Sequence, residues 1–125
     1  MNFETVMINL PVRRQTLRDL LCTAVEGGSN YWATFSNAEQ TESLDYIKVK
    51  VTENESSREG TPRVNRYITA DDLASGLSRL GQAAANDDGT FQAAGKHLAD
   101  ALGDHDATTA DVVLQMTIFG ELIYG

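Results

Sequence analysis

The stretch from residue 107 to about residue 119 constrains the fold most, because apolar side chains would cover nearly its whole circumference if it were wound as a helix. These side chains are Val112, Val113, Leu114, Met116, Ile118 and Phe119. A helix that is apolar all round belongs inside a domain. We therefore expect residues 107–119 to form the central helix of the core, capped by Asp106 or Thr108, with residues 120–125 continuing as an extended or frayed tail.

Three other segments have the amphipathic pattern of helices that pack on such a core. Residues 12–26 carry leucines and an alanine at helical spacing, and Gly27 and Gly28 should end this helix in a left-handed cap conformation. Thr69 is placed to cap a second helix, whose first turn has two aspartates and whose buried side has leucines. Residues 90–102 predict a third, alanine-rich helix after a loop at residues 86–89.

Strand patterns occupy most of the first half of the chain. Residues 3–10, 30–35, 44–52 and 64–68 alternate in polarity or are rich in aromatic and β-branched residues, as strands are. The last two segments predict a hairpin across a polar connection at residues 53–62. The fold class is therefore α+β: a small antiparallel sheet of three or four strands packed against about four helices, the last of them central and buried.

Length and cysteine content limit the class of protein further. A chain of 125 residues is the size of a single domain, here residues 1–125. One cysteine permits no disulfide within the chain, which fits a reducing compartment. The sequence has no apolar run long enough to span a membrane and no signal-peptide pattern at its start, so we expect a cytoplasmic protein.

The formal net charge is −8, from 18 acidic and 10 basic residues. This balance favours solubility and disfavours nonspecific binding to DNA or RNA, which needs a dense cationic surface. Arg13 and Arg66 each belong to a small basic cluster and could meet a phosphate group. We therefore expect no direct nucleic-acid binding, and we keep these two arginines as candidate ligand contacts.

Catalytic signatures are absent from the sequence: it has no nucleophile elbow, phosphate-binding loop, zinc-type cluster or dinucleotide fingerprint. His97 and His105, with aspartates at positions 100, 104 and 106, imitate a metal site, but acids near a helix end are more often solvated caps. Cys22, on the edge of a buried helix face, fits a packed thiol better than a nucleophile. The sequence predicts a protein without catalytic residues, metal or cofactor.

Two polar constellations are candidate ligand-binding groups. Asn30, Tyr31 and Trp32 set an amide beside two aromatics, which suits stacking on a flat ring and binding its polar edge, although the aromatics could simply fill the core. Asp111 and Gln115 lie four residues apart, on one face of the buried helix. Asp111 has a second explanation as a first-turn acid stabilised by the helix dipole. Gln115 has none, so it indicates an internal polar network or a pocket.

Three blocks of sequence lie near the two ends of the chain: EGGSNYW at residues 26–32, ADVVLQ at residues 110–115 and FGELIYG at residues 119–125. Together they resemble a family of small bacteriophage and prophage proteins. The resemblance implies a phage origin, and so the cytoplasm of the host cell, but it implies no particular activity.

Three functions fit these features. The first is a non-enzymatic binding protein that sequesters a small nucleotide-derived molecule such as an immune signal, with Trp32 and Tyr31 stacking on the base. The second is an acidic module that inhibits a host defence or metabolic enzyme by binding it. The third is a minor virion-associated structural role. A homo-oligomer formed through an exposed Trp32 or Tyr124 is also compatible with the sequence.

Overall fold

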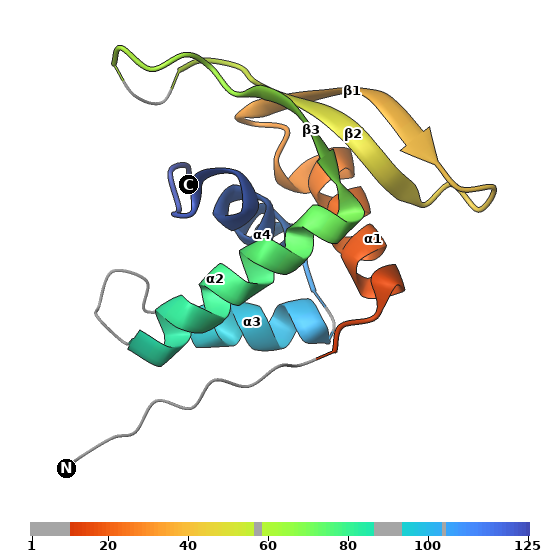
Figure 1. Ribbon diagram of the computed structural model, residues 1–125, viewed down its shortest axis with the longest axis vertical. Coiled ribbons are helices and arrows are strands. Elements are labelled where there is room, and N and C mark those ends of the chain that lie inside the picture. The colour runs from red at the N-terminus through yellow and green to blue at the C-terminus, as the bar shows by residue number, and fades with distance from the viewer. Residues whose placement is uncertain (1–10, 57–58, 87–93, 104) are drawn as a thin grey trace.

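The computed structural model describes residues 11–56, 59–86, 94–103 and 105–125 (Figure 1). The strand predicted at residues 3–10, the loop after residue 86 and the start of the third predicted helix lie outside these ranges. The elements are α1 (Arg14–Thr23), η1 (Ala24–Gly28), β1 (Ala33–Gln40), β2 (Tyr46–Glu53), β3 (Asn65–Thr69), η2 (Ala70–Asp72), α2 (Leu73–Asn86), α3 (Ala94–Leu102) and α4 (Ala107–Phe119). In these ranges, no helix has the length and apolar character needed to cross a membrane.

The α+β class is confirmed: a three-stranded antiparallel sheet in the order β1-β2-β3 packs against four α-helices, which lie on one side of it (Figure 1). Buried Val49 and Val51 of β2 alternate with the more exposed Lys48 and Lys50, so one face meets the core. The β1–β2 pairing shifts register between Ser36 and Glu39, where the intervening residue 37 has φ 52°.

Strand β1 begins later than the strand that the sequence predicted at residues 30–35. Residues 30–35 were expected to be extended, but the carbonyl oxygen of Ser29 accepts hydrogen bonds from the backbone N–H groups of Trp32 and Ala33, at 3.2 and 3.1 Å. These two bonds hold residues 29–32 in a turn. The aromatic pair therefore lies just before β1, where the chain leaves the first helix.

Helix α4 is central, as predicted. It contacts α1, α2, α3 and η1, and every residue from Thr109 to Thr117 is buried. Asp106 is its N-cap, because the carboxylate accepts a hydrogen bond from the backbone N–H of Thr109 at 2.8 Å. That bond lowers the pKa of the Asp106 carboxyl below its usual value. Gly120 ends the helix in the left-handed conformation, with φ 74°.

The expected left-handed cap at Gly27 and Gly28 is wrong. The first helix ends instead in the π-helical turn η1, where Gly27 has an extended φ of 177°. Within the described ranges, the glycines whose φ lies between about 20° and 160° are Gly60, Gly120 and Gly125. Gly28 is needed for space, since a Cβ there would lie 2.6 Å from the carbonyl oxygen of Ala107, so η1 can touch the start of α4.

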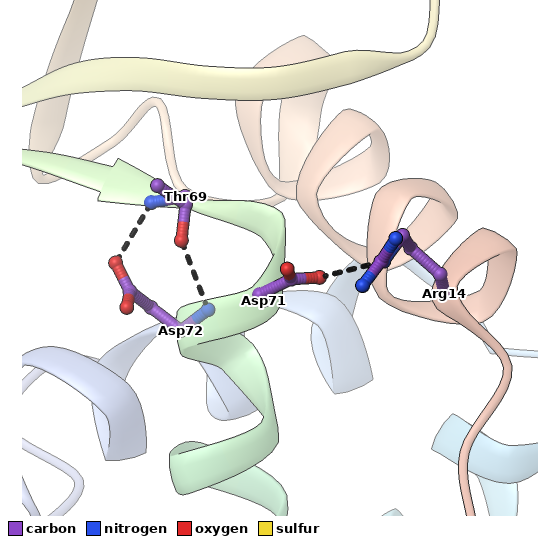
Figure 2. Close-up of polar contacts among 4 residues, drawn as sticks. All are labelled: Arg14, Thr69, Asp71 and Asp72. Atoms are coloured by element: carbon purple, nitrogen blue, oxygen red, sulfur yellow. Dashed lines mark hydrogen bonds and ion pairs between the residues drawn. The ribbon is translucent and has the colours of Figure 1, made fainter.

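A capping box joins β3 to the second helix (Figure 2). The Thr69 hydroxyl accepts from the backbone N–H of Asp72 at 3.2 Å, and the Asp72 carboxylate accepts from the backbone N–H of Thr69 at 2.8 Å. The predicted cap at Thr69 is confirmed, with a short 3₁₀ turn before α2. In the same view Arg14 of α1 pairs with Asp71 at 3.4 Å, an exposed contact of small energetic value.

Helices α2 and α4 cross so closely that their backbones are in contact at Gly76. A Cβ on Gly76 of α2 would lie 2.2 Å from the Thr117 hydroxyl and 2.6 Å from the Val113 carbonyl oxygen. One turn further along α2, Arg79 donates from Nη1 to the carbonyl oxygens of Met116 and Thr117, at 2.6 and 2.9 Å. These carbonyls near the end of α4 gain a cationic partner where the helix dipole favours one.

Substituting Gly76 tests this crossing. We expect Gly76→Ala to lower the free energy of unfolding by about 2–3 kcal/mol, because two helices must move apart. Gly81→Ala is the matched control in the same helix, where the new Cβ would meet only Leu98 at an ordinary 3.8 Å. It should be neutral or stabilising by about 0.5–1 kcal/mol. Urea denaturation measures both changes, and equal effects of the two variants would contradict the close crossing.

Candidate functional site

The Asp111 carboxylate is the centre of a buried polar network. Its Oδ1 accepts hydrogen bonds from the Ser29 hydroxyl and the Trp32 indole N–H, both at 2.7 Å. Its Oδ2 accepts from the Tyr31 hydroxyl at 2.6 Å and the Gln115 Nε2 at 2.9 Å. A carboxylate has about four lone-pair sites, so these four donors fill its accepting capacity.

Gln115 extends the network to the C-terminal segment. Its Oε1 accepts from the backbone N–H groups of Ile123 and Tyr124, at 2.9 and 2.8 Å, while Nε2 also lies 3.2 Å from the Tyr124 carbonyl oxygen. The side-chain amide thus forms hydrogen bonds with the main chain of two consecutive residues. Residues 120–125 therefore fold back onto α4, which corrects the expectation of an extended or frayed tail.

Aromatic side chains close the network on one side. The ring of Trp32, 2% exposed, stacks on the ring of Tyr124 at a centroid distance of 5.2 Å and an angle of 8°. Phe119 packs against Trp32 at 5.5 Å in a tilted arrangement. The Tyr124 hydroxyl donates to buried Glu53, whose other carboxylate oxygen accepts from the backbone N–H of Val64 at 3.0 Å. The end of β2 and the C-terminal segment are thereby tied together.

A hollow of about 330 Å³ lies beside this network. Its lining comes from four parts of the chain: η1 with the turn that follows it, α3, the first turns of α4, and the C-terminal segment. The lining residues are Gly27, Gly28, Tyr31, His97, Ala107, Thr108, Asp111, Val112, Leu122, Tyr124 and Gly125. The volume is in the range of small-molecule sites. Tyr31 is 56% exposed, so its ring is available to a molecule that enters the hollow.

The Tyr31 hydroxyl and the His97 imidazole are two polar groups at the wall of the hollow. Burial, followed by the hydrogen bond to Asp111, raises the pKa of the Tyr31 hydroxyl well above its usual value, so the group stays a neutral donor. His97 holds the Thr109 hydroxyl at 3.0 Å through Nδ1. The lining residues that the structure describes include neither lysine nor arginine. A ligand here would meet the Tyr31 ring, the His97 imidazole, the Asp111 side chain, hydroxyls and backbone groups.

The structure gathers some of the predicted site residues and not others. Tyr31, Trp32, Asp111 and Gln115 share the network. Asn30 is exposed beside them. Arg13 precedes α1, and the ten residues of that helix put it roughly 15 Å before η1. Arg66 is exposed on β3, and neither arginine lines the hollow.

The residues weighed as metal ligands or as a nucleophile have other partners. His105 shares a hydrogen bond with the Thr23 hydroxyl through Nε2 at 3.0 Å, and His97 pairs with Thr109. In the part of the chain with described coordinates, no three His, Cys, Asp or Glu side chains are grouped to hold a metal; Asp104 lies outside that part. Burial, then the nearby Glu26 carboxylate, raises the pKa of the Cys22 thiol, which disfavours the nucleophilic thiolate.

Three members of the network were missed from the sequence: Ser29, Glu53 and Tyr124. Glu53 was assigned to the polar loop, although its spacing from Val49 and Val51 places it on the buried face of β2. That spacing was a usable signal. Ser29 gave none, because a serine after two glycines is typical of a loop.

Comparison with known proteins adds no relative. No family model, no curated protein and no solved structure matches this chain.

Replacing Asp111 by asparagine tests the network. An amide at this position has one accepting oxygen and adds two donors, so two of the four present donors would lose their acceptor. We expect Asp111→Asn to lower the free energy of unfolding by about 2–4 kcal/mol in urea denaturation. Asp71→Asn, which removes only the exposed pair with Arg14, should cost at most about 1 kcal/mol. Equal losses would show that the network contributes little.

A pH series tests the Tyr31 hydrogen bond. The pKa of Tyr31 is raised above 10.0 in the folded state, so its stabilising contribution is complete below about pH 10 and is lost as the pH rises through the folded value. We expect Tyr31→Phe to be less stable than wild type by about 1 kcal/mol at neutral pH. The difference should shrink above about pH 10. Tyr46 also has a raised pKa but is present in both chains, so its effect cancels. A constant difference would contradict the assignment.

Proposed function

We propose that this protein is a non-enzymatic binding protein of phage type that holds a small molecule in the hollow beside Tyr31, in the cytoplasm of the host cell. The observation that carries the proposal is an open hollow of about 330 Å³ next to an exposed ring whose hydroxyl is already fixed by Asp111. A ring held in place before binding loses little conformational freedom when a ligand stacks on it.

In this proposal the buried network shapes one wall of the hollow, and most of its side chains do not contact the ligand. Asp111 accepts hydrogen bonds from Ser29, Trp32 and Gln115. Gln115 in turn accepts hydrogen bonds from the backbone of the C-terminal segment. Trp32 is covered by Tyr124 and Phe119. These side chains therefore hold Tyr31 and shape the hollow. Contacts to the ligand would come from Tyr31, His97, Thr108 and the backbone at the two glycines.

A planar, uncharged ring system fits this lining best, such as the base of a nucleotide-derived signal. The ring can stack on Tyr31, while hydroxyl and backbone groups match its polar edge. A phosphate would find no arginine or lysine among the described lining residues, and Arg13 lies too far away. The phosphate end of a nucleotide would therefore point out of the hollow into solvent.

Thermal unfolding tests the proposal with a panel of free bases, nucleosides, linear nucleotides and cyclic nucleotides. A true ligand at about 100 times its Kd should raise the melting temperature by roughly 10 °C. Tyr31→Ala should abolish the rise, whereas Tyr67→Ala, an exposed tyrosine on the distant strand β3, should keep it. Bases and nucleosides should act as well as nucleotides. A panel without any effect, or an effect equal in both variants, would argue against the site.

A second candidate, an acidic module that binds a host enzyme, has one favourable observation. Leu44, in the turn between β1 and β2, is 69% exposed, and acidic Glu42 and Asp45 flank it. An apolar tip ringed by carboxylates is a suitable contact for a partner with a basic pocket. A host enzyme recovered with the purified protein, released by moderate salt and lost with Leu44→Ser, would favour this candidate over ligand binding.

A further inference from the structure

The C-terminal segment lies in a site that has the features of a peptide-binding site. Gln115 matches the main chain at residues 123 and 124 with both ends of its amide, at distances of 2.8–3.2 Å. These bonds go to main-chain groups, so they do not depend on the identity of the side chains of the segment. Selectivity comes from a single side chain, that of Tyr124.

Tyr124 fills a socket made by three residues far apart in the sequence. Its ring lies parallel to Trp32 and tilted against Phe119, with centroids 5.2 and 6.1 Å away. Its hydroxyl donates to the buried Glu53 carboxylate and lies 3.2 Å from the carbonyl oxygen of Glu55. An aromatic ring with a matched polar end is a typical anchor of a peptide in a protein groove.

The socket is held in shape by groups outside the segment. Asp111 fixes both Trp32, through the indole N–H, and Gln115, through Nε2. Glu53 is held on β2 and bonds the Val64 N–H. A site positioned in this way can receive a segment that is not covalently attached, because little ordering is left for the binding step.

The connection between α4 and Tyr124 is short and exposed. It begins at the left-handed Gly120, and Glu121 and Leu122 follow on the surface. Residues with this exposure and a glycine at the turn can act as a hinge, and departure of the segment would uncover the ring of Trp32. Since Leu122, Tyr124 and Gly125 also line the hollow, their departure would open one of its walls.

We propose that Gln115, Trp32, Phe119 and Glu53 form a binding site for a tyrosine-bearing peptide segment, which residues 122–125 fill within the chain and which the same segment of a second copy can fill between chains. A short connection gives the attached segment an effective concentration in the millimolar range. Exchange between copies is therefore a feature of high protein concentration.

The first test uses full-length Tyr124→Ala and a synthetic peptide with the sequence of residues 120–125. The substitution removes the anchor and leaves the socket in place, so the peptide should raise the melting temperature of the variant and restore the fluorescence of Trp32, the single tryptophan. A peptide with phenylalanine for tyrosine should bind about tenfold less tightly, because it lacks the hydrogen bond to the Glu53 carboxyl group. The full-length control Tyr67→Ala keeps its own anchor and should not respond.

The outcome that overturns the proposal is a folded Tyr124→Ala that shows no response to millimolar peptide. If Tyr124→Ala does not fold, Tyr124→Phe takes its place, since it keeps the stacked ring and lacks only the hydroxyl. The tyrosine peptide should then displace the weakened segment.

For exchange between copies, native mass spectrometry of the wild-type chain near 1 mM should show dimers that are lost in Tyr124→Ala. Monomers alone at that concentration would refute exchange. None of these readouts depends on a molecule in the hollow.

Discussion

The structure depends on the four hydrogen bonds to one buried carboxylate. Taking an ionised carboxyl group out of water costs several kcal/mol unless donors replace the lost water. At Asp111 the donors come from the turn after η1 and from the same face of α4. The first-helix end, the start of β1 and the central helix can therefore satisfy the carboxylate in one relative arrangement only. Misplacing any of them would leave both a buried charge and buried donors unpaired.

The same constraint explains why the C-terminal segment is ordered without regular secondary structure. Gln115 has a fixed orientation because one of its ends is held by Asp111, so its other end presents an acceptor at a fixed place. Two backbone N–H groups then find a partner that water would otherwise provide. Stacking of Tyr124 on Trp32 adds apolar burial to this polar match. A chain of contacts thus runs from the carboxylate to the last residues.

Much of the fold could be predicted from the sequence, because it rests on periodicity. The apolar circumference of residues 112–119 identified the central helix, and Thr69 with two following aspartates identified the start of another. The conformation predicted for the end of the first helix, a left-handed cap, was wrong. Two adjacent glycines indicate that a helix stops, but here the close approach to Ala107 decides the conformation, and that contact is tertiary.

The candidate site was predicted in part for the same reason. A lone glutamine on an apolar helix indicated a polar network, and the network exists. The number and identity of the donors to Asp111 could not be predicted from the sequence, because Ser29 and Tyr31 reach Asp111 only through the fold of a turn. Trp32 was expected to face a ligand; it lies under Tyr124 instead. The hollow itself is lined by glycines and segment ends, and no sequence pattern marks such a combination.

The irregular pairing of β1 has a consequence for how these molecules behave in a crowded cell. An exposed edge strand with a regular row of N–H and C=O groups is a template on which further chains can add. In β1 the register slips between Ser36 and Glu39, and Asn37 turns out of the strand conformation with φ 52°. The outer edge is interrupted halfway, so a foreign strand finds too few consecutive partners to attach. This defect in the ladder makes the β1 edge a poor template for fibrous self-assembly.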